Sequence, residues 1–125
     1  MNNPYQQIDI ETASPVQLIV KLYEGAIRFI RTGAEHQSEG RVKERCVSLG
    51  RALDIVAELR RSLDMERGGE ISYNLDRLYE FASERILEAN SGGREEALDE
   101  AIRALDPVLD AWRRIASGEV EPADV

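Results

Sequence analysis

Apolar residues recur along most of this chain with the period of an α-helix, and no stretch of useful length alternates as a β-strand would. The first predicted helix has a clear start, where Ser14 is a good N-cap, Pro15 suits the first turn and Gln17 completes a capping box. We expect this helix to run to about residues 34–37. The local signals at its start therefore agree with the apolar period.

A seven-residue apolar repeat predicts a second helix over about residues 41–66, ended by Gly68 and Gly69. The repeat consists of Val42, Leu49, Val56 and Leu63, with Cys46 and Leu53 between them. Because Cys46 lies on this seam, we expect it to be a buried structural thiol rather than a reactive one.

Two further helices are predicted, over about residues 70–90 and 94–117. The later helix contains Pro107, and an interior proline removes a backbone hydrogen bond. The sequence therefore predicts either a kink near Leu105 or a break, in which Asp106 caps a new helix.

Four helices with short connections predict an all-α fold, an antiparallel up-down four-helix bundle over residues 14–117. Residues 118–125 are predicted to be a disordered acidic tail. Residues 1–13 form a polar leader in which Tyr5, Ile8 and Ile10 are apolar. This leader is interpreted as an extended cap segment that covers a groove, or alternatively as a flexible tail.

The formal net charge of −8 disfavours binding to nucleic acid or to anionic membranes, because phosphate recognition needs a basic surface. The single cysteine allows no intrachain disulfide, which favours a reducing cytoplasm. No apolar run approaches the ~20 residues of a membrane span. The remaining partner class is another protein, such as a basic or amphipathic peptide.

The sequence offers little for catalysis, and neither a metal site nor a cofactor site is predicted. One histidine and one cysteine, far apart, do not make a zinc or di-iron site. A histidine phosphotransfer protein using His36 is the alternative function. Its motif, His-x-x-Lys-Gly, is matched only in part, because Glu39 stands where the lysine would be. We therefore expect a protein that is not an enzyme.

The first helix has more apolar surface than a bundle helix needs. At 100° per residue, its apolar arc is about 200° wide, whereas a core-facing helix needs little more than ~100°. It also contains Gly25, which lowers helix stability but permits close approach of another backbone. Either this helix is central in the bundle, or one flank of it is a groove for a partner helix.

Three segments of the chain resemble the FliS family of flagellin-specific export chaperones. They are "NPYQQIDIETASPVQLIVKLYEGAIRFI" near the N-terminus, "LDMERGGEISYNLDRLYEF" from residue 63 to residue 81, and "DAWRRI" from residue 110 to residue 115. The matching positions include Tyr5, Ala13-Ser14-Pro15, Leu18 and Leu22-Tyr23-Glu24-Gly25-Ala26. Pro107 departs from the family pattern.

The resemblance implies a cytoplasmic chaperone that binds the disordered C-terminal segment of flagellin. Binding would prevent premature polymerisation and keep flagellin ready for export, and other flagellar export or regulatory proteins would be further partners. Tyr5 and Ile8 are assigned to the cap, Leu18, Leu22 and Gly25 to the groove beside it, and Ile55, Leu59 and Leu87 to further contacts. A purely structural helical subunit is a third possibility, and it predicts no such groove.

Overall fold

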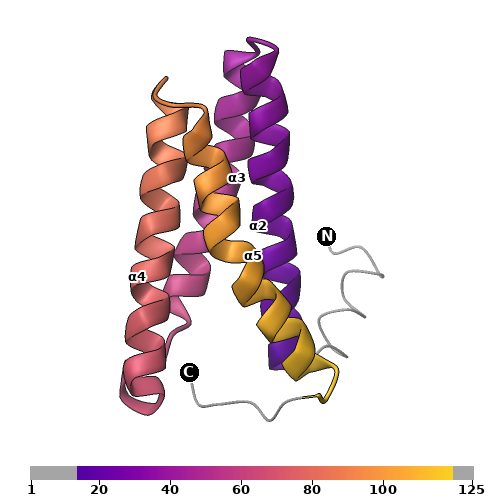
Figure 1. The fold of residues 1–125 in the computed structure, drawn as a ribbon, viewed down its shortest axis with the longest axis vertical. Coiled ribbons are helices and arrows are strands. Elements are labelled where there is room, and N and C mark those ends of the chain that lie inside the picture. The colour runs from indigo at the N-terminus through magenta and orange to yellow at the C-terminus, as the bar shows by residue number, and fades with distance from the viewer. Residues whose placement is uncertain (1–13, 120–125) are drawn as a thin grey trace, which may run out of the picture.

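The computed structural model describes residues 14–119, which form an antiparallel four-helix bundle. The helices are α2 (Pro15–Ser38), α3 (Val42–Arg61), α4 (Met65–Asn90) and α5 (Glu96–Ala116), running alternately up and down (Figure 1). The predicted fold class is confirmed. The predicted cap segment, residues 1–13, and all but the first two residues of the predicted tail lie outside the described residues.

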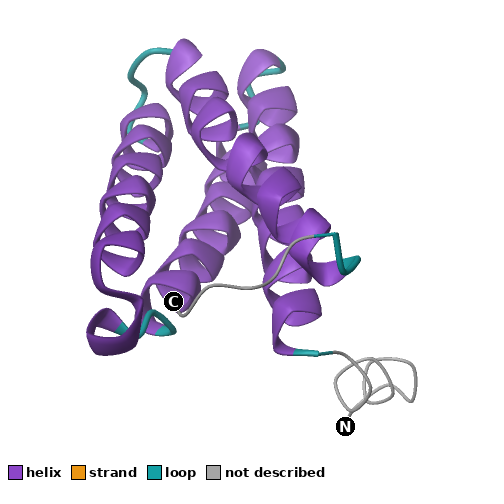
Figure 2. Cartoon of the chain, turned by 60° about the horizontal axis from the view of Figure 1, so that its bottom comes forward, coloured by secondary structure: helices purple, strands orange, loops and turns teal. Residues whose placement is uncertain are grey.

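Helix α2 packs against α3 and α5, and α4 packs against the same two helices from the other side. Helix α5 crosses the bundle obliquely, so that it starts beside α4 at the top of Figure 1 and ends beside α2 at the bottom. In Figure 2 the bottom of the bundle comes forward, and the lower ends of α4 and α5 are well separated. The helices diverge at the end of the bundle where α2 begins.

Apolar side chains from all four helices form one core. Its members are Tyr23, Ala26, Ile27, Ile30, Leu49, Ala52, Val56, Leu59, Tyr79, Ala82, Ile86, Ala89, Ala97, Leu98, Ala101, Leu105, Leu109 and Trp112. The alanines let helix backbones approach closely, and burial of the larger side chains is the main driving force for folding.

The predicted capping box at the start of α2 is confirmed. The hydroxyl of Ser14 accepts a hydrogen bond from the Gln17 amide (3.1 Å), and the Gln17 side chain accepts one from the Ser14 amide (2.9 Å). These two bonds satisfy backbone donors that no earlier helical turn can satisfy. They fix the direction in which the first turn of α2 leaves the bundle end.

The predicted end of the second helix is wrong. Helix α3 ends at Arg61 rather than near residue 66, and α4 begins after Asp64, whose side chain accepts a hydrogen bond from the Arg67 amide (2.9 Å). Gly69 does not terminate α3; it takes a positive φ of 51° at a kink inside α4, which separates a short first turn from the long remainder of the helix. The N-cap at Asp64 is therefore the local signal that ends one helix and starts the next.

The prediction that Cys46 is buried is also wrong, since Cys46 is exposed and Val42 is 58% exposed. The buried stripe of α3 instead contains Leu49, Ala52, Val56 and Leu59. At 100° per residue, Cys46 lies about 100° from the centre of that stripe, so it points away from the core.

Pro107 does not break the last helix. Helix α5 continues from Glu96 to Ala116 with Pro107 inside it, so Asp106 does not cap a new helix. Pro107 lies on the exposed face of α5. At an exposed position, water can hydrate the carbonyl that the missing N–H would have bonded.

Candidate functional site

A groove of about 340 Å³ lies at the end of the bundle where α4 and α5 diverge. All four helices contribute to it, and most of its lining is apolar. The lining residues are Pro15, Leu18, Ile19, Leu22, Glu58, Leu59, Ser62, Leu63, Tyr79 and Trp112. We call this surface the groove.

The first turns of α2 supply one wall of the groove. Leu18 and Leu22 are four residues apart, so they lie on one face of the helix, and both are only half-buried. The end of α3 supplies the opposite wall with Leu59, which is 2% exposed. The groove is therefore a place where the apolar arc of α2 is not fully covered by the described residues.

Two buried tyrosines meet at the floor of the groove. The hydroxyls of Tyr23 and Tyr79 lie 2.5 Å apart in a hydrogen bond, and their rings make an edge contact with centroids 6.1 Å apart. Tyr79 lines the groove, whereas Tyr23 is 0% exposed and lies behind it.

Burial raises the pKa of Tyr23 and of Tyr79 above the ordinary tyrosine range, so both hydroxyls stay protonated. The indole N–H of Trp112 approaches the Tyr23 hydroxyl and opposes the rise in the pKa of Tyr23. This N–H is buried but makes no hydrogen bond of normal geometry to any residue between 14 and 119. The floor is therefore rich in hydrogen-bond donors.

A larger hollow, of about 810 Å³, lies between α2 and α5. Its lining is mostly charged, and the charges pair with one another: Arg113 donates to Glu24 at 2.8 Å, and Arg31 lies 4.0 Å from Asp106. Such a surface is well solvated, so the smaller apolar groove is the better candidate for a binding site.

The structure brings three of the predicted contact residues together, since Leu18, Leu22 and Leu59 all line the groove. The predicted contact residues Gly25, Ile55 and Leu87 do not line it. Gly25 is buried at the contact of α2 with α3, where a Cβ atom would lie 3.4 Å from Cδ1 of Ile55.

Leu87 is 54% exposed on α4 and does not line the groove. The cap residues Tyr5 and Ile8 lie outside the described residues. The assignments of these three residues therefore stay predictions.

Sequence reasoning missed the two aromatic residues of the groove floor, Tyr79 and Trp112, as site residues. Tyr79 lies three residues before Ala82 and seven before Ile86, on the same helical face as both. The period of α4 could therefore have placed Tyr79 in the core. Nothing in the sequence pattern indicates that its ring would also face an opening.

Neither a metal site nor a phosphotransfer site is supported. Between residues 14 and 119 no three His, Cys, Asp or Glu side chains gather closely enough to hold a metal ion. His36 lies in the last turn of α2 and is half-buried, rather than fully exposed in mid-helix. In the same stretch of chain, none of the helices has the length and apolarity needed to cross a bilayer.

The fold and the groove define a class of protein: a small helical bundle with an open apolar surface at one end. The family model described as "Flagellar protein FliS" matches residues 1–119. The chain belongs to the FliS family.

Curated relatives agree with this family over most of their length. Flagellar secretion chaperone FliSB of Pseudomonas aeruginosa is 36% identical, covering 90% of this chain and 92% of its own. Flagellar secretion chaperone FliS of Vibrio cholerae is 34% identical, covering 89% of this chain and 85% of its own. That of Bacillus subtilis is 29% identical over 95% and 90%, respectively. These relatives are named for chaperone activity and not for catalysis.

Proposed function

We propose that this chain is a cytoplasmic, non-catalytic chaperone that binds the C-terminal segment of flagellin in the groove. The guest segment would bind as an amphipathic helix, and its apolar face would be buried rather than available for polymerisation. The observation that carries the proposal is the groove itself, where half-buried leucines of α2 face Leu59 and Tyr79 across an open space. The names of the relatives support a secretion substrate as the guest.

The energetics fit a guest that folds as it binds. Ordering a disordered segment costs 2–5 kcal/mol or more, so the contact must bury much apolar surface. Each buried leucine-sized side chain contributes about 1.5–3 kcal/mol. A few such contacts in the groove offset the ordering cost, and contacts elsewhere, such as at Leu87, would add affinity.

The leader, residues 1–13, is proposed to cover part of the groove until the guest displaces it. Its apolar residues Tyr5 and Ile8 would be the groups that bind there. Removal of residues 1–13 should then tighten guest binding, because the guest no longer competes with the leader. Unchanged affinity in the truncated chain would contradict this role for the leader, without affecting the groove itself.

Titration calorimetry of the chain with the C-terminal segment of flagellin from the same organism tests the function. Substitution Leu22→Asp should weaken binding about 10- to 100-fold, because it places a carboxylate on an apolar wall. The matched control is Val47→Asp, since Val47 is also an apolar helical residue but is 50% exposed and outside the groove.

Thermal unfolding followed by circular dichroism must accompany the titration. If Leu22→Asp unfolds the bundle, Leu18→Asp takes its place, because Leu18 lies on the same wall but one turn nearer the N-terminal end of α2. The proposed function is wrong if the wild-type chain does not bind the segment, or if folded groove variants bind it as tightly as Val47→Asp does.

A further inference from the structure

Of the described residues that line the groove, only Glu58 is charged. It lies in the last turn of α3, next to Leu59, which forms one wall of the groove. The carboxylate therefore gives an otherwise uncharged surface a local negative charge, on a chain whose formal net charge is −8. Such a field attracts a cation on a bound partner and repels an anion.

The intramolecular partner of Glu58 is one that a bound guest can join or replace. Arg61 donates a hydrogen bond to Oε2 of Glu58 within α3, and the two side chains are 68% and 57% exposed, respectively. Exposed pairs three residues apart on one helix contribute little to stability. A carboxylate also accepts several hydrogen bonds through its two oxygens, so a second cation can bind beside Arg61.

The neighbouring Arg60 does not compete for this position. Its guanidinium bonds Asp76 and Glu80 on α4, with N–O distances of 2.5 Å and 3.1 Å. The arginine that lies between Glu58 and Arg61 in the sequence is therefore used to join α3 to α4, and it leaves the carboxylate of Glu58 at the rim of the groove.

A guest helix in the groove would change the surroundings of Glu58. When its apolar face contacts Leu18, Leu22 and Leu59, it displaces water from the lining residues, and Glu58 is one of them. A carboxylate that loses hydration destabilises the complex unless a cation or donor replaces the water. The same loss of water strengthens an ion pair that the guest makes there.

We propose that Glu58 is a specificity-determining residue of the groove, which pairs with a lysine or arginine beside the apolar face of the guest helix. This inference rests on the proposed function, because it takes the guest to be a helical segment of flagellin. It adds a requirement for charge to a groove whose other lining residues select for apolar surface.

Lysine and arginine fit this position because of their shape as well as their charge. Their apolar stems can lie on an apolar wall such as Leu59, while the charged group reaches a carboxylate at the rim. An aspartate or glutamate at the same place would be repelled, and an apolar residue would cover Glu58 without pairing with it. The groove therefore distinguishes between helices whose apolar faces are alike.

The test compares two variants of the full chain that lose the same charge from the same helix. Glu58→Gln removes the proposed determinant, and Glu44→Gln is the control, since Glu44 is exposed in the first turn of α3 and outside the groove. Calorimetry with the C-terminal flagellin segment in dilute salt should show about three- to tenfold weaker binding for Glu58→Gln and less than about twofold for Glu44→Gln. The difference between the variants should shrink in about 1 M NaCl, because salt screens the pair.

A second arm reverses both charges. Each lysine and arginine of the flagellin segment is replaced by glutamate, one at a time, and each altered segment is titrated into the wild type and into Glu58→Lys. One replacement should weaken binding to the wild type about tenfold and should be rescued, at least in part, by Glu58→Lys. That rescue identifies the guest residue that pairs with Glu58, and a merely structural role for Glu58 does not predict it.

The proposal is overturned if folded Glu58→Gln binds as tightly as the wild type or more tightly. It is also overturned if both glutamine variants weaken binding equally, which would show a general attraction to the acidic chain, or if Glu58→Lys rescues no altered segment. These outcomes differ from failure of the proposed function, in which the wild-type chain itself does not bind the segment.

Discussion

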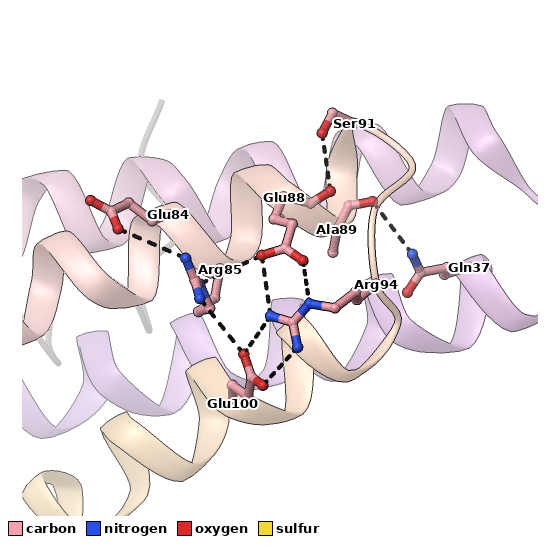
Figure 3. Close-up of polar contacts among 8 residues, drawn as sticks. All are labelled: Gln37, Glu84, Arg85, Glu88, Ala89, Ser91, Arg94 and Glu100. Atoms are coloured by element: carbon pink, nitrogen blue, oxygen red, sulfur yellow. Dashed lines mark hydrogen bonds and ion pairs between the residues drawn. The ribbon is translucent and has the colours of Figure 1, made fainter.

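At the end of the bundle where α4 turns into α5, charged side chains hold the helices together, whereas at the opposite end apolar side chains line an open groove. Figure 3 shows the charged end, where Arg94 bridges Glu88 on α4 and Glu100 on α5. Its closest contacts are 2.7 Å to Glu88 and 3.0 Å to Glu100. We call these the charged end and the groove end.

The packing of α2 against its neighbours is also tighter toward the charged end than at the groove end. Toward the charged end, Gly33 packs against Leu49 so closely that a Cβ atom would lie 2.4 Å from the leucine Cδ2. At the groove end, Leu18 and Leu22 remain half-buried. The contact between α2 and α3 is therefore closer toward the charged end than the contacts that Leu18 and Leu22 make at the groove end.

The largest expected effect comes from truncating a buried leucine at each end. Leu49 is 0% exposed and Leu59 is 2% exposed, and both lie on α3. Leu→Ala in a core costs about 2–5 kcal/mol, and the cost is highest where the surroundings cannot collapse. We expect Leu49→Ala to lower the free energy of unfolding more than Leu59→Ala, as measured by urea denaturation.

The two variants should rank in the opposite order by their loss of affinity for the flagellin segment. Leu59→Ala removes part of the groove wall and should weaken binding of the flagellin segment, whereas Leu49→Ala should leave the affinity of the folded protein unchanged. The comparison between the ends fails if Leu59→Ala proves the more destabilising of the two, since that would mean the groove end is the more tightly packed.

The apolar period predicts much of this fold but little of the site. The capping box at Ser14 and the stripe of α5 act locally, so the residues themselves reveal them. The excess apolar arc of α2 likewise indicates an uncovered flank, and Leu18 and Leu22 lie on it. Local pattern fails for Cys46 because the buried stripe continues three residues after Leu49 and Val56, at Ala52 and Leu59, whereas Cys46 lies four residues after Val42.

The floor of the groove depends on the oblique path of α5, which no local pattern encodes. Tyr23 and Tyr79 are separated by 56 residues, and Trp112 comes from a third helix. Their meeting requires the relative positions of α2, α4 and α5. The contact between the two tyrosines is therefore visible only after the helices have been placed.

An intermediate change in stability is expected when two glycines of α2, Gly33 and Gly25, are replaced by alanine. Gly33→Ala forces a methyl group against Leu49, whose Cγ would lie 2.8 Å from the new Cβ, so overpacking should cost roughly 1–3 kcal/mol. The better helix propensity of alanine offsets about 1 kcal/mol of that cost. Gly25→Ala is the matched control, because its Cβ would lie 3.4 Å from Ile55, which is an ordinary contact.

Urea denaturation should therefore show Gly33→Ala to be less stable than the wild type, and Gly25→Ala to be as stable or more stable. Equal stabilisation by both alanines would show that Leu49 can move aside. The packing at the charged end would then be no tighter than that near the groove.

The smallest expected effect is a pH dependence at the charged end. Hydrogen bonds from Arg94 hold the pKa of Glu88 and the pKa of Glu100 below the ordinary range. A carboxylate with a lowered folded-state pKa stabilises the fold above the unfolded value of about 4.3, and that contribution is lost as the pH falls through the folded-state pKa. Arg94→Gln should thus lower the melting temperature at neutral pH, with a difference from the wild type that shrinks in acid.

The control is Arg103→Gln, because Arg103 pairs with Asp99 at 3.3 Å within α5 and joins no two helices. Exposed pairs of this kind contribute little to stability, so its melting temperature should follow that of the wild type at every pH. Neither arginine variant should change guest binding, since both substitutions lie outside the groove. If the difference for Arg94→Gln instead grows as the pH falls, the carboxylates do not stabilise this end through Arg94, and the contrast with the groove end loses its electrostatic part.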